Sequence, residues 1–314
     1  MMEEKEPSRT PVGRFAPSPS GFLHLGNLLS LLLAWLDCRS LGGEIVFRLE
    51  DLDPARSGQD YACAMADDLR WLGLDWDRGW PEDLSCAQSR RTEIYEEAFQ
   101  TLKDRGLIYP CWCSRSKRLA AASAPHEGER ESDFGCCCSR MSDAERESML
   151  RTGRNPAWKL RSPDRKIGIN DFHYGLFSQN PAREAGDCIV RRSDGVFAYQ
   201  LAVSVDDMLM GVTRVVRGRD LLPSAPRQKW LIETLGGKAP DYGHCPLIMG
   251  DKGKLSKRLG SLNTQTLRKE KQAEEVIGEL AFLCGLTARP EPVSAKELIP
   301  HFSWSKVKTE DIPL

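Results

Sequence analysis

Hydrophobic residues in the first third of the chain alternate between strand-like and helix-like spacing. An apolar segment at residues 14–16 ends at two prolines, and a leucine-rich segment over 25–40 predicts a helix. Alternating β-forming residues at 45–49 predict a second strand, and helical spacing returns at 61–72 and 91–105. Strand, helix and strand in this order predict a βαβ unit with a parallel sheet.

The middle of the chain has a different pattern. Residues 111–190 combine cysteines, a polar stretch and short strand-like runs, which predicts an insertion. The earlier pattern resumes at DCIVRRSDGVFAYQLAVSVDD, where residues 193–195 predict a tight turn between two strands. A helix is expected at 225–234, and residues 251–314 open with a lysine-rich loop and continue with helical spacing.

These elements predict an α/β protein with a Rossmann-like parallel sheet for nucleotide binding. At 314 residues the chain is longer than most single domains, so more than one lobe is expected. The expected parts are a disordered tail at 1–11, the first half of the Rossmann-type domain at 12–110, the insertion at 111–190, the second half at 191–250, and a loop with a short helical part at 251–314.

The composition excludes several classes of protein. The hydrophobic fraction is 40%, the charged fraction is 28% and the net charge is -1, so any contact with nucleic acid is expected to be local. No stretch reaches the roughly 18 apolar residues of a membrane span, and the N-terminal sequence MMEEKEPSRT is polar, unlike a secretory signal. We therefore expect a cytoplasmic protein without a membrane partner.

Five of the eleven cysteines lie close together in the sequence, between Cys111 and Cys138. A disulfide scaffold is typical of short secreted chains, and this chain is neither short nor preceded by a signal. Clustered cysteines in a longer chain instead indicate a metal site in a reducing compartment. Thiols without a metal are the alternative.

The sequence RFAPSPSGFLHLGN joins the first predicted strand to the first predicted helix. His24 and Asn27 fall in the first helical turn, where N–H groups and the positive end of the helix dipole attract anions. Both side chains can donate to phosphate oxygens, and Gly26 allows close backbone approach. The alternative is that His24 only caps the helix.

A second candidate phosphate site is the sequence GKLSKRLG. Lys254 and Lys257 lie three residues apart in a loop bounded by glycines, with Ser256 and Arg258 beside them. Such a cationic loop can stabilise charge that develops on a transferring phosphate. A solvated charged loop is the alternative.

Together, HLGN and KLSKR resemble the HIGH and KMSKS signatures of class I aminoacyl-tRNA synthetases in order and separation. The sequences RFAPSPSG, FRLEDLDPAR, YQLAVSVDD and VVRGRDLL resemble the glutamyl branch of that family over residues 13–258. The resemblance implies ATP-dependent activation of L-glutamate as glutamyl-adenylate, followed by transfer to RNA. Mg²⁺ is expected with the ATP, because the triphosphate charge needs neutralisation.

The chemistry of glutamate agrees with this resemblance. Its two carboxylates require fixed cations, and Arg14 and Arg217 lie at predicted strand ends where guanidinium groups can bind carboxylates. Glu50 can accept from the ammonium group, and Tyr199 places a hydroxyl on an apolar predicted strand. Surface salt bridges and a core tyrosine are the alternatives, and the pairing of each arginine with one carboxylate stays open.

The resemblance implies three sets of site residues. The catalytic set is His24, Asn27, Lys254 and Lys257. The ATP-binding set is His24, Gly26, Asn27 and Lys257. The glutamate-binding set is Arg14, Phe15, Ala16, Pro17, Ser18, Glu50, Tyr199 and Arg217.

The segment after Arg258 is too short for the helical anticodon-binding region of a glutamyl-tRNA synthetase. This length and the sequence DGVFAYQLAVSVDD resemble a shortened family, the glutamyl-queuosine tRNA(Asp) synthetases. That resemblance implies transfer of glutamate to the queuosine base of tRNA(Asp). The alternatives are a truncated glutamyl-tRNA synthetase that charges the tRNA 3′ end, a nucleotidyltransferase with the HIGH fold, and a non-catalytic RNA-binding paralogue.

The shortened family has a zinc site made by a CxC pair and by a tyrosine and a cysteine four residues apart. Cys111, Cys113 and Cys138 match three of these positions, but Phe134 replaces the tyrosine and cannot coordinate a metal. Zinc prefers four donors in a tetrahedron, so we expect Cys136 as the fourth. Less favoured donors are Cys137, Asp133 and His126. The resemblance implies one structural Zn²⁺ per chain.

Overall fold

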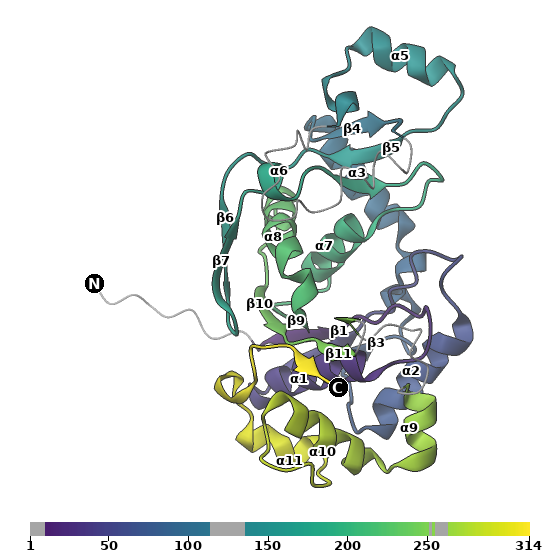
Figure 1. Ribbon diagram of the computed structural model, residues 1–314. Coiled ribbons are helices and arrows are strands. Elements are labelled where there is room, and N and C mark those ends of the chain that lie inside the picture. The colour runs from purple at the N-terminus through teal and green to yellow at the C-terminus, as the bar shows by residue number, and fades with distance from the viewer. Residues whose placement is uncertain (1–9, 114–135, 251–252, 255–262) are drawn as a thin grey trace.

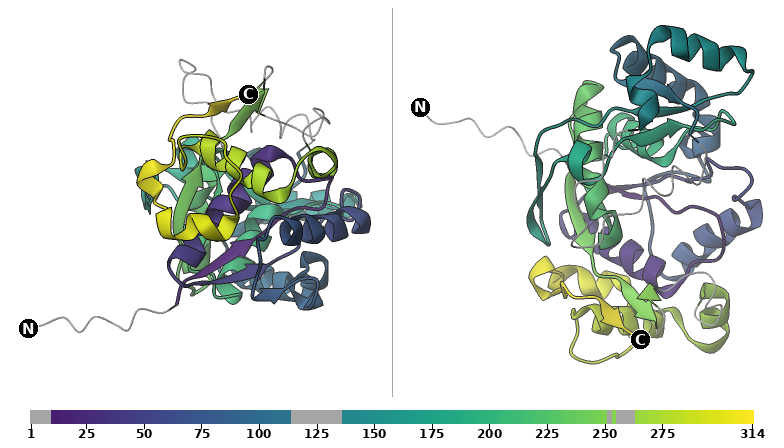
Figure 2. Two further views of the ribbon diagram at one scale, coloured as in Figure 1. Left: turned by 90° about the horizontal axis from the view of Figure 1, so that it is seen from below. Right: turned by 45° about the horizontal axis from the view of Figure 1, so that its top comes forward.

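The structure of the protein, a computed structural model, describes residues 10–113, 136–250, 253–254 and 263–314. Most of the predicted tail at 1–11 and of the lysine-rich loop therefore lies outside the described residues. Figure 1 shows the insertion at the top, the parallel strands with their helices in the middle, and the C-terminal helices at the bottom. The same succession is visible in the right view of Figure 2.

Parallel strands form the centre of the molecule. In spatial order they are β3 (Arg78–Gly79), β2 (Glu44–Phe47), β1 (Val12–Phe15), β9 (Arg214–Gly218) and β10 (Asp241–Cys245). β1 and β9 belong to two separate ladders that lie side by side, and the Thr213 N–H donates to the Val12 carbonyl at 2.9 Å. This order of parallel strands confirms the predicted Rossmann-like sheet.

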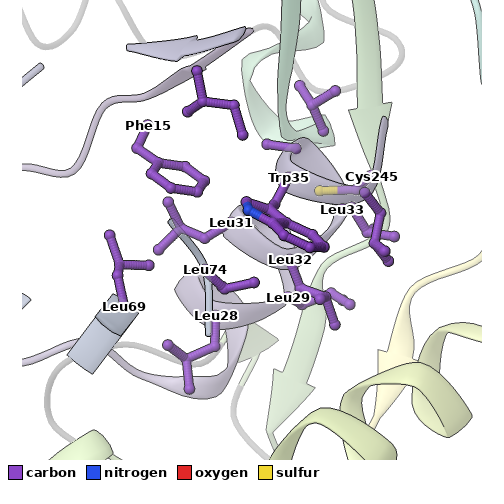
Figure 3. Packing of buried hydrophobic residues seen from close by; sticks show 14 of the residues in the cluster. Phe15, Leu28, Leu29, Leu31, Leu32, Leu33, Trp35, Leu69, Leu74 and Cys245 are labelled. Atoms are coloured by element: carbon purple, nitrogen blue, oxygen red, sulfur yellow. The ribbon is translucent and has the colours of Figure 1, made fainter. Parts of the chain in front are cut away.

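The leucine-rich segment forms α1 (Leu25–Ser40), as predicted. Its apolar residues are buried around the whole helix and not along one face only, as in a helix that is covered on all sides. Figure 3 shows them packed with Phe15, Leu69 and Cys245, which come from three different elements. Dense packing of this kind fixes the helix whose first turn carries the predicted phosphate-binding residues.

Three further helices cover the strands close to their predicted ranges. They are α2 (Gln59–Trp71), α3 (Thr92–Asp104) and α8 (Ala225–Thr234). The α8 range agrees with the prediction at both ends. Amphipathic spacing was sufficient for α2 and α3, each of which has one buried and one exposed face, whereas Glu233 is the one exposed residue of α8.

The segment after the turn at 193–195 is the helix α7 (Tyr199–Leu209), so the prediction of a strand there is wrong. All residues at 201–207 are buried. A continuously buried segment has neither helical nor strand spacing, and the β-branched Val203 and Val205 favour a strand when the sequence is considered alone.

The middle of the chain forms a small antiparallel sheet and a hairpin. The sheet contains β4 (Ile108–Cys111), β5 (Ala157–Leu160) and β8 (Cys188–Arg191), the hairpin contains β6 (Ile167–Asp171) and β7 (Gly175–Gln179), and two short helices are α5 (Asp143–Arg151) and α6 (Pro181–Glu184). In Figure 1 the hairpin extends down to the parallel strands, where the Phe172 N–H donates to the Tyr242 carbonyl at 2.9 Å. The hairpin therefore connects this part of the chain to the central sheet.

The C-terminal part packs against α1. Its helices are α9 (Thr264–Glu270), α10 (Ala273–Cys284) and α11 (Ala295–Leu298), and its strands are β11 (Ile248–Gly250), β12 (Gly253–Lys254) and β13 (Ile312–Pro313). The helices agree with the predicted helical spacing, whereas the pairing of β13 with β11 was not predicted. Within the described ranges, no helix is both long enough and apolar enough to cross a membrane.

Candidate active site

A cleft with a volume of about 480 Å³ opens where β1 and β9 end. The predicted site residues that line it are Arg14, Ala16, Pro17, Ser18, His24, Gly26, Asn27, Glu50, Tyr199 and Arg217. Phe15 is not among the lining residues, because its side chain is fully buried and packs edge-on against Phe47. The fold thus brings together the ends of β1 and β9, which are far apart in the sequence, around one cleft.

His24 is both the N-cap of α1 and part of the cleft wall. Its backbone N–H donates to Asn27 Oδ1 at 3.2 Å, and the Asn27 N–H donates to His24 Nδ1 at 3.4 Å. Because Nδ1 accepts, the neutral imidazole carries its hydrogen on Nε2. The cap therefore selects the tautomer whose Nε2–H can donate to an anion, and the two sequence-based interpretations of His24 are compatible.

Gly26 lies in the first turn of α1, close to the His24 ring. A Cβ atom at this position would lie 3.1 Å from His24 Cε1 and 3.2 Å from Nδ1. The absence of a side chain therefore leaves room for the imidazole. The first turn of this described helix holds no acidic residue, so the positive end of the helix dipole is not neutralised there.

Two buried arginines line the cleft, Arg14 at 6% and Arg217 at 5% exposure, which excludes surface salt bridges as their role. Arg14 Nη1 donates to the Val216 carbonyl at 2.8 Å. Its Nε lies 3.6 Å from Asp207 Oδ1 and has no hydrogen-bond partner among the described residues. Burial lowers the pKa of Arg14, and the nearby Asp207 opposes this shift. A buried cation with incomplete hydrogen bonding favours an anionic ligand.

Glu50 lines the cleft just beyond β2 and is held by Arg48, which is fully buried. Arg48 donates to Glu50 Oε1 at 3.0 Å and to Asp207 Oδ1 at 2.6 Å. Burial raises the pKa of Glu50, and Arg48 opposes the shift. The sequence analysis missed Arg48 and Asp207. The available signal was a charged residue inside each of the apolar runs FRLE and VSVDD, because a buried charge needs a partner.

Arg217 is fixed by several acceptors. Its Nη1 donates to Gln228 Oε1 at 2.7 Å, and its Nη2 donates to the Leu221 carbonyl at 3.2 Å. Tyr199 also lines the cleft, but as the first residue of α7 and not as a strand residue. Burial raises the pKa of Tyr199, so its hydroxyl stays neutral and can both donate and accept.

The described ends of the lysine-rich loop lie next to the cleft. Lys254 belongs to β12, which pairs with β11, and Ile248 of β11 lines the cleft. After the loop, Asn263 forms a β-bridge with His24. Lys257 lies outside the described residues, together with Ser256 and Arg258. The chain thus re-enters the described structure beside His24, after leaving it from a strand paired with β11.

Four cysteines of the middle part form a candidate metal centre. The sulfur atoms of Cys111, Cys113, Cys136 and Cys138 all lie within 4.8 Å of one another. Cys136 Sγ lies 3.4 Å from Cys111 Sγ and 3.3 Å from Cys113 Sγ. A tetrahedral zinc with Zn–S bonds of about 2.3 Å has its sulfurs about 3.8 Å apart, so this set fits such an ion.

The thiols of this cluster differ in their readiness to ionise. Burial raises the pKa of Cys111 to about 11. Burial acts in the same direction at Cys136, but hydrogen bonds from Cys113 and Cys111 outweigh it and lower the pKa of that thiol. Cys137 is exposed, and the other donors considered from the sequence, Asp133 and His126, lie outside the described residues, as does Phe134. The cluster can therefore hold a metal ion through four thiolates.

Comparison with known proteins gives consistent results. The family model for the catalytic domain of class I tRNA synthetases (E and Q) matches residues 12–311. The glutamyl-Q tRNA(Asp) synthetase of Symbiobacterium thermophilum is 45% identical over 307 residues, which cover 96% of this chain and 94% of the relative. The glutamyl-Q tRNA(Asp) synthetase of Nitratidesulfovibrio vulgaris is 42% identical over 308 residues, with the same coverage.

A solved structure has the same architecture. The chain is similar to a glutamate tRNA ligase from Elizabethkingia meningosepticum, solved in complex with its amino acid, with a TM-score of 0.80 and 27% identity. The similarity covers 97% of this chain and 67% of that one. The family match, the identities over nearly full length and the shared fold lead to one conclusion: the chain belongs to the class I tRNA synthetases of the E and Q type.

Proposed function

We propose that this protein joins ATP and L-glutamate to form glutamyl-adenylate and pyrophosphate, and then transfers glutamate to the queuosine base of tRNA(Asp) with release of AMP. The observation that carries the proposal is the convergence of Arg14, Glu50 and Arg217 with the N-terminus of α1 in one cleft. The choice of RNA is supported by the name glutamyl-Q tRNA(Asp) synthetase, which relatives of nearly equal extent carry.

The charges of the cleft complement those of glutamate. Arg14 and Arg217 can each bind one carboxylate, and Glu50 can accept from the ammonium group. Because both arginines are buried, solvent screens their attraction to a carboxylate less than it would at the surface. Tyr199 adds a neutral hydroxyl that can orient the ligand.

The activation step needs positioning and charge stabilisation more than proton transfer. An oxygen of the glutamate α-carboxylate attacks the α-phosphorus of ATP, a new O–P bond forms, and the bond to pyrophosphate breaks. The carboxylate is already a nucleophile, so no general base is required. His24 Nε2–H, the Asn27 side chain and the α1 N-terminus stabilise charge at the α-phosphate.

The departing pyrophosphate also carries negative charge. Lys254 and Lys257 are proposed to bind it, because the loop between β12 and Asn263 begins and ends beside the cleft. When bound with ATP, Mg²⁺ supplies further neutralisation of the phosphates.

The deciding experiment is to find where glutamate is attached. Radiolabelled glutamate is incubated with the full chain, ATP and three RNAs: tRNA(Asp) with queuosine, tRNA(Asp) without it, and tRNA(Glu). Label is expected only on the first RNA, and nuclease digestion is expected to release it on the queuosine nucleoside. Label on the 3′-terminal adenosine would instead establish an ordinary charging enzyme.

Pyrophosphate exchange without RNA separates the remaining alternatives. Exchange that depends on glutamate is expected and would exclude both a nucleotidyltransferase for another product and a non-catalytic RNA-binding protein. Exchange supported by ATP alone, or its complete absence, would contradict the proposal.

We also propose that Cys111, Cys113, Cys136 and Cys138 bind one structural Zn²⁺. Four protein thiolates fill a tetrahedral site and leave no open position for a reacting water, so this ion would stabilise the middle part of the chain. None of the eleven cysteines, all of which lie in the described ranges, forms a disulfide, which agrees with a reducing compartment, and we propose the cytoplasm.

A further inference from the structure

A line of buried polar side chains connects the β6–β7 hairpin to the cleft. Asp171, the last residue of β6, has its Oδ2 2.6 Å from Nδ1 of His244 in β10. On the other side of the ring, His244 Nε2 lies 3.1 Å from Nε of Arg217. Asp171 is 1% exposed and His244 is 0% exposed, so water does not compete for these contacts.

The hydrogen positions in this line follow from chemistry. The Nε–H of Arg217 can only donate, so His244 Nε2 must be the acceptor. The neutral ring then carries its hydrogen on Nδ1, which donates to the Asp171 carboxylate. Burial lowers the pKa of His244, in agreement with a neutral ring. His244 can therefore accept from Arg217 only in the tautomer that Asp171 selects.

Asp171 is itself fixed by the main chain. Its Oδ1 accepts from the N–H groups of His173 at 3.0 Å and Tyr174 at 2.8 Å, and from the His244 N–H at 3.3 Å. Burial acts against ionisation, but the hydrogen bonds from His244 and these N–H groups lower the pKa of Asp171. A charged acceptor in a fixed position gives the His244 ring one orientation.

The geometry points to Asp171 and His244 as positioning residues that hold the Arg217 guanidinium in the plane needed to bind a glutamate carboxylate. Among the described residues, the Arg217 guanidinium donates hydrogen bonds to His244, to Gln228 and to the Leu221 carbonyl. Loss of the first would leave a buried N–H without an acceptor and allow the group to rotate. The inference rests on the proposed function and adds two residues that do not line the cleft.

The first test compares His244→Asn with His244→Gln in the full chain by pyrophosphate exchange. Glutamine can place its carbonyl oxygen near the position of Nε2, whereas asparagine is too short to reach Arg217. The KM for glutamate is expected to rise by about tenfold or more in H244N and much less in H244Q, since a hydrogen bond to a charged group is lost only in the first. The KM for ATP is expected to stay unchanged in both. Equal effects of the two substitutions, or parallel changes in both KM values, would overturn the inference.

A third variant separates this inference from the proposed function. Arg217→Gln tests whether Arg217 binds glutamate at all. If R217Q raises the KM for glutamate and H244N does not, only the positioning role fails. If neither variant changes it, Arg217 lies outside the glutamate site and the proposed site fails with it.

The second test measures the wild-type protein, and a substitution serves only to assign its signals. Nitrogen NMR of the full chain labelled with ¹⁵N-histidine reports which ring nitrogen carries hydrogen, and H244Q identifies the His244 signals by their loss. Hydrogen on Nδ1 and a bare Nε2 are expected. Hydrogen on Nε2 would overturn the inference whatever the kinetics show.

Discussion

The imidazole of His24 accepts a hydrogen bond through one ring nitrogen and lines the cleft with the same ring. From the sequence, capping and phosphate binding are alternatives for this residue. The structure makes them complementary, because the cap occupies Nδ1 and leaves the ring hydrogen on Nε2. The tautomer depends on a contact with the Asn27 N–H that only the folded helix provides, so the sequence could not predict it.

Substitution of Gly26 tests whether the position of the His24 ring affects the rate of adenylate formation. In Gly26→Ala the new Cβ would crowd the His24 ring, and the kcat of adenylate formation is expected to fall on the order of tenfold, because small displacements of a catalytic group are costly. The KM for glutamate is expected to stay the same. Gly168→Ala is the matched control, since its Cβ meets only a Leu176 methyl at 3.7 Å. Equal activity of G26A and wild type would contradict this role of the ring.

Glu50→Gln is expected to separate stability from binding. Burial raises the pKa of Glu50 in the folded protein. The free energy of unfolding therefore falls as the pH rises from the usual carboxyl pKa through this raised pKa, and at neutral pH the stability is still reduced. A neutral glutamine does not carry a buried charge, so E50Q is expected to unfold at a temperature no lower than that of wild type at pH 7. Its KM for glutamate is expected to rise about tenfold or more, because the ammonium group loses a charged acceptor.

Thermal unfolding and pyrophosphate exchange on the same preparation check both parts of the Glu50 prediction. A clear drop in unfolding temperature would mean that the Arg48–Glu50 ion pair stabilises the fold more than burial of the carboxylate opposes it. An unchanged KM would remove Glu50 from the glutamate site.

The residues that line the cleft were predictable because they occur in contiguous motifs. The buried charged residues that hold the cleft residues in place were not predictable from motifs. Arg48 and Asp207 meet across the fold, and so do Asp171 and His244, although each pair is far apart in the sequence. No spacing rule connects such residues, and their pairing follows from the requirement that a buried charge be neutralised.

At the level of elements, amphipathic helices were predicted well and continuously buried segments were not. The α3 range could be predicted from one buried face, which carries Tyr95, Phe99 and Leu102, whereas α7 is buried along 201–207 and gave no periodic signal. The helix α1 is also buried on all sides, but its length and its run of leucines favoured a helix without periodicity. The length of the segment and its residue types therefore predicted the helix α1, which hydrophobic spacing alone could not predict.

The docking of the β6–β7 hairpin on β10 depends on a glycine. A Cβ at Gly243 would overlap the ring of Phe172. Gly243→Ala is therefore expected to lower the free energy of unfolding by about 1–3 kcal/mol, as overpacking does. In a Phe172→Leu background the same substitution is expected to cost less, and a double-mutant cycle by chemical denaturation measures the difference. If the two substitutions change the free energy of unfolding additively, the side chains at positions 243 and 172 do not overlap.

At the scale of the whole molecule, the hydrophobic cluster around Cys111 and Cys138 is small and separate from the large cluster of the parallel sheet. A small apolar cluster stabilises little by itself, which is the situation in which a metal ion is most useful. The sequence predicted this cluster with Cys136 as the fourth donor, and the fold brings Cys136 together with Cys111, Cys113 and Cys138 while Cys137 is exposed.

A matched pair of substitutions tests the metal centre. Purified wild type is expected to contain about one zinc ion per chain, Cys136→Ser clearly less, and Cys137→Ser as much as wild type, since four ligands complete a structural site. Elemental analysis measures the content, and C136S is also expected to unfold at a lower temperature. Equal zinc loss in both variants would show that the metal is bound by a different set of donors.

The C-terminal part helps to hold α1 in its position in the fold. Trp304 Nε1 donates to Asp37 of α1 at 2.7 Å, and Arg214 of β9 binds the same carboxylate through two hydrogen bonds of 2.7 Å. The helix that begins at the cleft is therefore held at its far end by the central sheet and by the C-terminal part together.

The last residues support the cleft wall directly. The Ile312 N–H donates to the carbonyl of Leu247, a cleft residue, at 2.8 Å, and the Leu314 N–H donates to the Met249 carbonyl at 2.9 Å. A purification tag fused directly to Leu314 would disturb the hydrogen bonds between the C-terminal residues and β11, and therefore the wall of the cleft. Protein for the assays above is better prepared with a flexible spacer between Leu314 and any tag.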